Sequence, residues 1–75
     1  LSGNDITDSA LKDVQEMQDL QMLYLVRTKV TDDGVKGLGA LKRLTFLDVY
    51  GTEVSEAGAK KLKEILLAVS INRAP

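Results

Sequence analysis

The strongest constraint on this chain is that its sequence resembles itself when it is shifted by 24 residues. Ile6, Val30 and Val54 share one position of this period. The other apolar positions that recur are Val14/Leu38/Leu62, Met17/Leu41/Ile65, Leu20/Leu44/Ala68, Leu23/Leu47/Ile71 and Leu25/Val49. A period of this length is typical of stacked units that share a core, because no single unit can bury its apolar residues alone.

Each period combines two kinds of hydrophobic pattern. Residues 22–26 and 46–50 alternate in a way that favours strands. Apolar residues at helical spacing predict helices near residues 8–18, 32–42 and 56–69. A strand, a helix and a strand in the same sheet imply parallel strands with right-handed crossovers.

The start of each predicted helix combines a hydroxyl residue with an acid. These pairs are Thr7–Asp8, Thr31–Asp32 and Ser55–Glu56. We expect the hydroxyl residues to be helix N-caps, and the acids suit the positive end of the helix dipole. In the first helix, Leu11, Val14 and Met17 are expected to face the core.

Two further motifs allow a comparison with a known family. The pattern L-x-x-L-x-L-x-x-T is formed by Leu20, Leu23, Leu25 and Thr28, and again by Leu44, Leu47, Val49 and Thr52. It resembles the leucine-rich repeat, and the segments VTDDGV and VSEAGA that follow are similar to the helix-containing bacterial and plant-like variant. The resemblance implies a short right-handed α/β solenoid with parallel strands on its concave face and helices on its convex face.

The same resemblance implies roles for the domain as a whole. It implies that Asn4, Thr28 and Thr52 hydrogen-bond the backbone of the neighbouring turn, and that the solenoid binds proteins. We expect one domain over residues 1–75, with repeats at about 5–28, 29–52 and 53–75, as part of a longer protein or assembly.

The third repeat departs from the pattern. Leu66, Leu67 and Val69 stand where the earlier repeats have polar residues, and Arg73 replaces an inward leucine or valine. We therefore expect one longer helix over 56–69, and whether a third strand forms near Ile71 stays open. The apolar run is either a cap over the end of the core or a second docking surface for another chain.

Several classes of function lack the residues that they need. The chain has no histidine and no cysteine, so Cys–His and Ser–His nucleophiles and zinc sites are excluded. Asp32 and Asp33 are adjacent, but a place at a helix start accounts for Asp32. With a net charge of −1 and no long apolar run, we expect no nucleic-acid or membrane partner. We expect no enzyme activity, metal or cofactor, and the sequence does not indicate a compartment.

The predicted strands suggest a binding surface. If Leu23, Leu25, Leu47 and Val49 point into the core, the alternate residues point to the opposite face. That face then carries Met22, Tyr24, Val26, Phe46, Asp48 and Tyr50, which include every aromatic residue of the chain. We expect it to bind another protein. The alternatives are a structural segment or cap of a longer solenoid, and an accessory subunit or a homo-oligomer held through the open solenoid ends.

Overall fold

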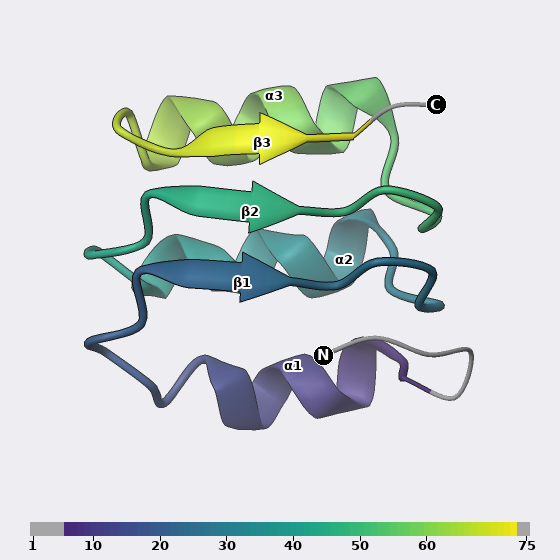
Figure 1. Ribbon diagram of the computed structural model, residues 1–75, viewed down its shortest axis with the longest axis horizontal. Helices are drawn as coiled ribbons and strands as arrows, with labels where there is room; N and C mark the ends of the chain where they lie inside the picture. Colours follow the sequence, from purple (N-terminus) through teal and green to yellow (C-terminus); the bar gives the residue numbers. More distant parts are fainter. Residues whose placement is uncertain (1–5, 74–75) are drawn as a thin grey trace.

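The computed structural model describes residues 6–73, and these form a small mixed α/β domain (Figure 1). The elements in chain order are α1 (Asp8–Val14), β1 (Met22–Tyr24), α2 (Asp32–Lys36), the 3₁₀-helix η1 (Gly37–Ala40), β2 (Phe46–Asp48), α3 (Glu56–Ile65) and β3 (Ser70–Asn72). Each α-helix and the strand that follows it are called a helix–strand unit below. Asn4 and the outermost residues of the predicted repeats, at 5, 74 and 75, lie outside the described residues.

The three strands form one parallel sheet in the order β1-β2-β3. Leu23 pairs with Leu47 and Leu47 with Ile71, so the register follows the 24-residue period. The strands predicted at 22–26 and 46–50 are confirmed in place and direction, and they are shorter than predicted. The third strand, which the sequence left open, forms around Ile71.

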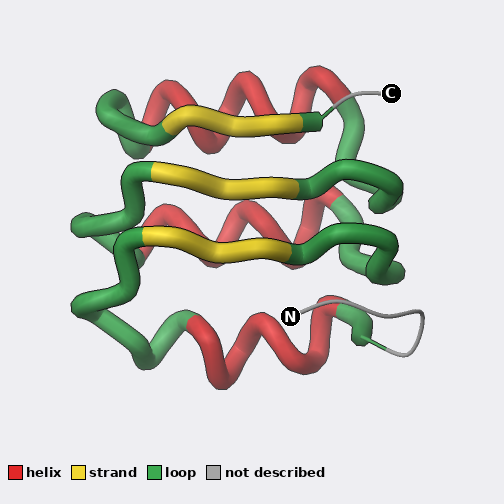
Figure 2. Tube along the Cα trace, viewed as in Figure 1, coloured by secondary structure: helices red, strands yellow, loops and turns green. Residues whose placement is uncertain are grey.

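The helices lie behind the sheet and leave its other face uncovered (Figure 2). The core fills the space between the sheet and the helices. Its buried residues are Leu11, Val14, Leu23, Leu25, Val30, Val35, Leu38, Leu41, Leu44, Leu47, Val49, Val54, Leu62, Leu66 and Val69. The four strand residues expected to point inward are all among them.

The first helix is shorter than predicted, and the placement of Met17 was wrong. α1 ends at Val14, and the Met17 N–H then donates to the Val14 carbonyl at 2.9 Å. The Leu20 N–H donates to the Met17 carbonyl at 3.0 Å. Leu41 makes the same two hydrogen bonds in the second unit and is 0% exposed, so the turn alone does not expose Met17. Met17 is 52% exposed because it lies in the first unit, beyond which no further unit of the described residues packs (Figure 1).

The second helical segment covers most of the predicted range 32–42, but it changes its geometry midway. α2 has α-helical geometry, and η1 continues as a 3₁₀-helix to Ala40. Gly37 and Gly39 weaken the helix here by about 1 kcal/mol each relative to alanine. Leu38 and Leu41, two of the apolar residues that recur with the 24-residue period, are nevertheless buried.

The third helix ends at Ile65, so the prediction of one helix over 56–69 was wrong at its carboxyl end. The Leu66 N–H still donates to the Leu62 carbonyl at 2.8 Å, and the Val69 N–H donates to the Leu66 carbonyl at 3.1 Å. The chain therefore turns at Leu66 and runs into β3 instead of continuing as a helix.

This turn has the same form as the one in the second unit, displaced by one residue. The Leu44 N–H donates to the Leu41 carbonyl at 3.0 Å, as Val69 does to Leu66. Leu66 and Val69 thus take the core places of Leu41 and Leu44, and they are 6% and 0% exposed. They cannot form the exposed docking surface considered from the sequence, and only Leu67 of that run lies on the surface.

Thr28 and Thr52, the two threonines after the strands, hydrogen-bond to backbone carbonyls of the turn in which they lie. Thr28 is buried, and its hydroxyl donates to the Leu25 carbonyl at 2.9 Å. The Thr52 hydroxyl donates to the Val49 carbonyl at 2.7 Å. The expected bond to a neighbouring turn is therefore replaced by a local one, three residues back in the chain.

Replacing Leu47 with alanine should lower the free energy of unfolding by about 2–5 kcal/mol, because its side chain is 1% exposed and a cavity would remain. Leu67→Ala is the matched control. Leu67 is 81% exposed, so its loss should change stability by no more than about 0.5 kcal/mol. Urea unfolding at 25 °C measures both values. Equal losses for the two variants would contradict this description of the core.

Candidate functional site

The uncovered side of the sheet is the first candidate surface and is called the open face. It carries the side chains at alternate strand positions. Met22 is 52% exposed, Tyr24 is 44% exposed, and Tyr50, two residues beyond β2, is 37% exposed. The half-buried members are Val26, Phe46 and Asp48. The strand register therefore places Met22, Tyr24, Phe46 and Asp48 on one face, and Val26 and Tyr50 follow in the turns after the strands. None of the six is fully buried.

The centre of the open face is a contact between two aromatic rings. The rings of Tyr24 and Phe46 have their centroids 5.4 Å apart and their planes tilted by 51°. Met22 lies beside Phe46 in the strand register. The pairing continues past the strands, since the Arg27 N–H donates to the Tyr50 carbonyl at 2.8 Å. The apolar residues of β1 and β2 thus form a continuous patch.

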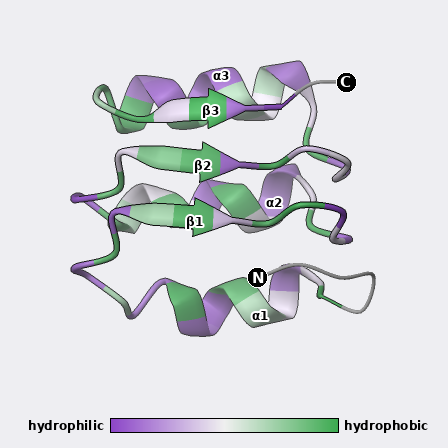
Figure 3. Ribbon diagram, in the orientation of Figure 1, coloured by the Kyte–Doolittle hydropathy of each residue, from purple (hydrophilic) through white to green (hydrophobic). Residues whose placement is uncertain are grey.

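β2 and β3 each end in a polar residue, Asp48 and Asn72, and the ribbon is hydrophilic at the end of both strands (Figure 3). Asp48 Oδ1 accepts hydrogen bonds from the Tyr50 N–H at 3.0 Å and from Asn72 Nδ2 at 3.3 Å. On β3, Ser70 pairs with Phe46 and Asn72 pairs with Asp48. Neither residue was predicted on this face, because the sequence left the third strand open, although the 24-residue period places both residues there.

Arg27 is another residue that was not predicted to belong to a functional surface. Its φ angle is +58°, and Gly51, which follows β2 at the corresponding position, has φ +73°. Such a backbone conformation costs a residue with a Cβ roughly 1–2 kcal/mol, and it costs glycine nothing. The glycine at the same position of the next unit was the available signal for this unusual turn.

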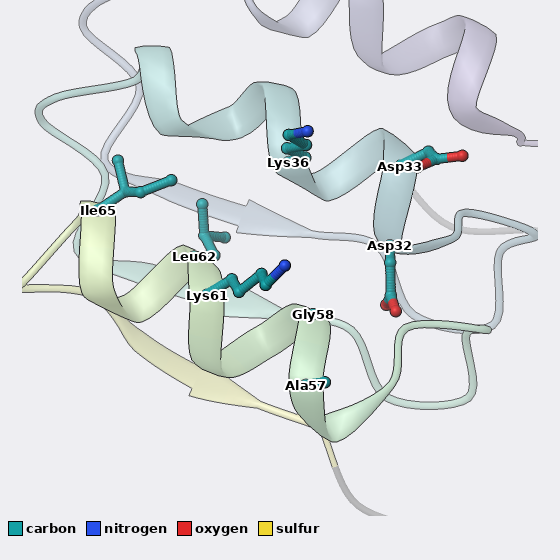
Figure 4. Close-up of a pocket in the computed structure, with 8 residues that line it drawn as sticks. All are labelled: Asp32, Asp33, Lys36, Ala57, Gly58, Lys61, Leu62 and Ile65. Carbon is teal, nitrogen blue, oxygen red and sulfur yellow. The ribbon is translucent and has the colours of Figure 1, made fainter.

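A pocket between α2 and α3 is the second candidate surface (Figure 4). Its volume is about 210 Å³. The lining residues are Asp32, Asp33, Lys36, Ala57, Gly58, Lys61, Leu62 and Ile65. Figure 4 shows Leu62 and Ile65 extending from α3 toward α2, while Asp33 points away from the pocket. The pocket therefore has an apolar floor and a charged rim on the helical side of the domain.

The acid on this rim already has hydrogen-bond partners. Asp32 Oδ1 accepts from the Ser55 N–H at 2.7 Å, and Oδ2 accepts from the Ser55 hydroxyl at 2.6 Å. Asp8 makes the same pair of bonds with Thr31, at 2.8 and 2.6 Å. Each carboxylate thus joins the start of one helix to the residue before the next, and each pair is called a carboxylate clamp below.

The clamps change the role predicted for the hydroxyl residues. The side chains of Thr7 and Thr31 make no capping hydrogen bond to their own helix. Ser55 does so, because its hydroxyl oxygen accepts from the Gly58 N–H at 3.1 Å. All three hydroxyl residues are therefore the N-cap residues that the sequence predicted, but only Ser55 caps its helix through its side chain.

Each clamp carboxylate packs against a glycine of the following helix, where a larger residue would collide with it. A Cβ built on Gly34 would collide with the Asp8 carboxylate, and one on Gly58 would collide with the Asp32 carboxylate. Both carboxylates therefore lie against bare backbone, in positions fixed by the fold. This explains Asp32 as a residue that holds the start of the third helix.

No group of three or more acids that could hold a metal ion occurs within residues 6–73. Every buried side-chain nitrogen and oxygen in this range has a hydrogen-bond partner. None of the helices described is both long and apolar enough to cross a membrane. Comparison with protein-family models and with curated proteins finds no match to this chain.

The clamp on Asp32 makes stability depend on pH. The hydrogen bond from the Ser55 hydroxyl, and then the one from its N–H, hold the pKa of Asp32 below its usual value of 3.8. A lowered pKa in the folded state means that the contribution is present above a pH of about 4 and is lost as the pH falls through the lowered value.

Asp32→Asn should therefore lower stability at pH 7 by about 1 kcal/mol, since an amide cannot accept both hydrogen bonds. The variant should also lose less stability than the parent chain between pH 5 and pH 2. Asp33→Asn is the control, because Asp33 is exposed and lies outside the clamp. Thermal unfolding across this pH range tests the pair, and parallel pH profiles for Asp32→Asn and the parent chain would refute the clamp.

Proposed function

We propose that this chain is a short leucine-rich-repeat module that binds another protein through the open face of its sheet. One observation carries the proposal. Met22, Tyr24 and Tyr50 are large apolar or aromatic side chains that remain exposed, and Met22 and Tyr24 alternate with the buried Leu23, on the side of the sheet away from the core. Exposed patches of this kind mark interaction sites, and tyrosine is enriched in them.

The repeat assignment is supported by features that recur 24 residues apart. The strand register has this offset across both strand pairs. The carboxylate clamps recur as well, from Asp8 to Thr31 and from Asp32 to Ser55. In the proposed short right-handed solenoid, the open face is the concave side. A concave sheet surrounds a ligand from several strands at once.

The proposed site has the layout of a protein interface. Tyr24 and Phe46 already pack against each other, so binding would not have to order both rings. Asp48 and Asn72 form a polar flank beside them. An apolar centre with a polar rim is the common arrangement of interfaces, and aromatic anchors at such centres account for much of the binding energy.

A second candidate function is that of a structural segment or cap in a longer solenoid, and the contacts at the end of the third unit favour it. Glu56 holds the position that Asp8 and Asp32 occupy in the clamps, and its carboxylate lies 3.9 Å from Arg73. Lys63 Nζ donates to the Val69 carbonyl at 2.6 Å. A polar outer face is what terminal units of repeat arrays need.

The cap can be tested through Lys63. Lys63→Ala should cost about 1 kcal/mol of stability, because the Val69 carbonyl loses its donor. Lys60→Ala, at an exposed position of the same helix, should cost little. Chemical unfolding of both variants gives the comparison. If Lys63→Ala costs no more than Lys60→Ala, the end of the third unit does not depend on this contact.

The binding proposal is tested by replacing Tyr24 and Tyr50 together with alanine. Peptides selected from a random library on the immobilised parent chain serve as the probe. The double variant should bind them at least tenfold more weakly, since interface anchors contribute about 2 kcal/mol or more. Its stability should fall by about 1 kcal/mol through the lost ring contact.

A control variant separates the open face from exposed apolar residues elsewhere. Met17 and Leu67 are 52% and 81% exposed and lie outside the open face. Replacing both with alanine should leave binding unchanged. If the control weakens binding as much as the tyrosine variant does, or if the tyrosine variant binds at full strength, the open face is not the site.

A further inference from the structure

Arg27 is the residue at the border of the open face that the fold alone does not explain. Its backbone is in the left-handed conformation that glycine adopts without strain, as Gly51 does one unit later. A glycine at position 27 would complete the same turn at lower cost. A strained backbone retained beside a candidate site points to a role for the side chain.

The direction of the Arg27 side chain is defined by its contact with the next unit. A Cβ built on Gly51 would lie 3.0 Å from Arg27 Cγ. The aliphatic stem of Arg27 therefore lies across the bare backbone of Gly51, the residue after Tyr50. Because the Arg27 N–H also donates to the Tyr50 carbonyl, Arg27 is held at the end of the apolar patch nearest Tyr50.

The charge of Arg27 is not neutralised within the described chain. The two other arginines each lie near an acid, Arg43 at 3.6 Å from Asp19 and Arg73 at 3.9 Å from Glu56. Arg27 is exposed, and no ion pair to it occurs within residues 6–73. The acid on the open face, Asp48, is instead bonded through Oδ1 to Tyr50 and Asn72.

We propose that the open face binds a peptide segment that carries a carboxylate next to apolar side chains, and that Arg27 binds this carboxylate. This inference rests on the proposed function of the same face. The apolar side chains of the segment pack on Tyr24, Phe46 and Tyr50, and its carboxylate meets the guanidinium at the Tyr50 end. The planar fork of arginine binds a carboxylate through two parallel hydrogen bonds, which also fixes the direction of the segment.

The decisive variant is Arg27→Gly, because it removes the charge while keeping the backbone conformation. Glycine adopts a positive φ freely, so the melting temperature should stay unchanged or rise. A peptide selected on the parent chain, synthesised with its glutamate or with glutamine in that place, is the probe. Arg27→Gly should weaken the glutamate peptide at least tenfold and leave the glutamine peptide unchanged.

Two further variants control for nonspecific effects of charge. Arg43→Ala removes another exposed arginine and should leave the affinity for the glutamate peptide unchanged. Arg27→Lys keeps the charge without the planar fork, so it should bind with intermediate affinity. Affinity for the parent chain should also fall as salt is added, since the pair lies at an exposed site.

The outcomes distinguish this inference from the function on which it rests. Arg27 does not bind a carboxylate of the partner if the selected peptides contain no acid. The same conclusion follows if the glutamate peptide binds Arg27→Gly as tightly as the parent chain. If those peptides still lose affinity for the Tyr24 and Tyr50 double variant, the open face remains the site. If no selected peptide depends on these tyrosines, both proposals fail.

Discussion

The alternation of side chains along β1 and β2 is the constraint on which both the core and the candidate site depend. Leu23 and Leu47 lie opposite each other in the register and are buried. Because successive residues of a strand point to opposite faces, Tyr24 and Phe46 must then lie on the other side. A shift by one residue would bury the tyrosine and expose the leucines. The apolar patch of the open face is thus a direct consequence of the core.

A second set of contacts holds the helix–strand units at a constant spacing. The clamp carboxylates of Asp8 and Asp32 each bind the N–H and the hydroxyl of the residue before the next helix. Gly34 and Gly58 leave the room that these carboxylates need. Backbone groups at a helix start otherwise lack partners within the helix. The clamps therefore join neighbouring units on the helical side, as the sheet does on the other.

Much of this arrangement follows from the sequence because it depends on local periodicity. Two patterns, the 24-residue period and the alternation around Leu23 and Leu47, were enough to predict where the strands lie. The same patterns predicted that the strands are parallel and that their leucines point inward. The same reasoning brought the six residues of the open face together. Periodicity was sufficient here because neighbouring units repeat the same local geometry.

The errors arose where the apolar pattern does not show the surroundings or the local geometry of a residue. Met17 keeps its place in the period, but it lies in the first described unit and stays exposed. The run from Leu66 to Val69 keeps helical spacing, but a three-residue turn redirects the chain there. The clamp from Asp32 to Ser55 joins residues 23 positions apart, so a local capping rule cannot reveal it. The positive φ of Arg27 could not be predicted from an arginine, and only the glycine one period later, Gly51, indicates a left-handed residue in this turn.

The central claim is that the exposed aromatic face, and not the helical side, is where a partner binds. The most direct test is a two-dimensional NMR titration of the isotope-labelled chain with a peptide selected on it. The account predicts that amide signals of β1 and β2, including Tyr24 and Phe46, shift as peptide is added, while those lining the pocket between α2 and α3 stay in place. Shifts confined to pocket residues such as Lys36 and Lys61, with unchanged strand signals, would contradict it.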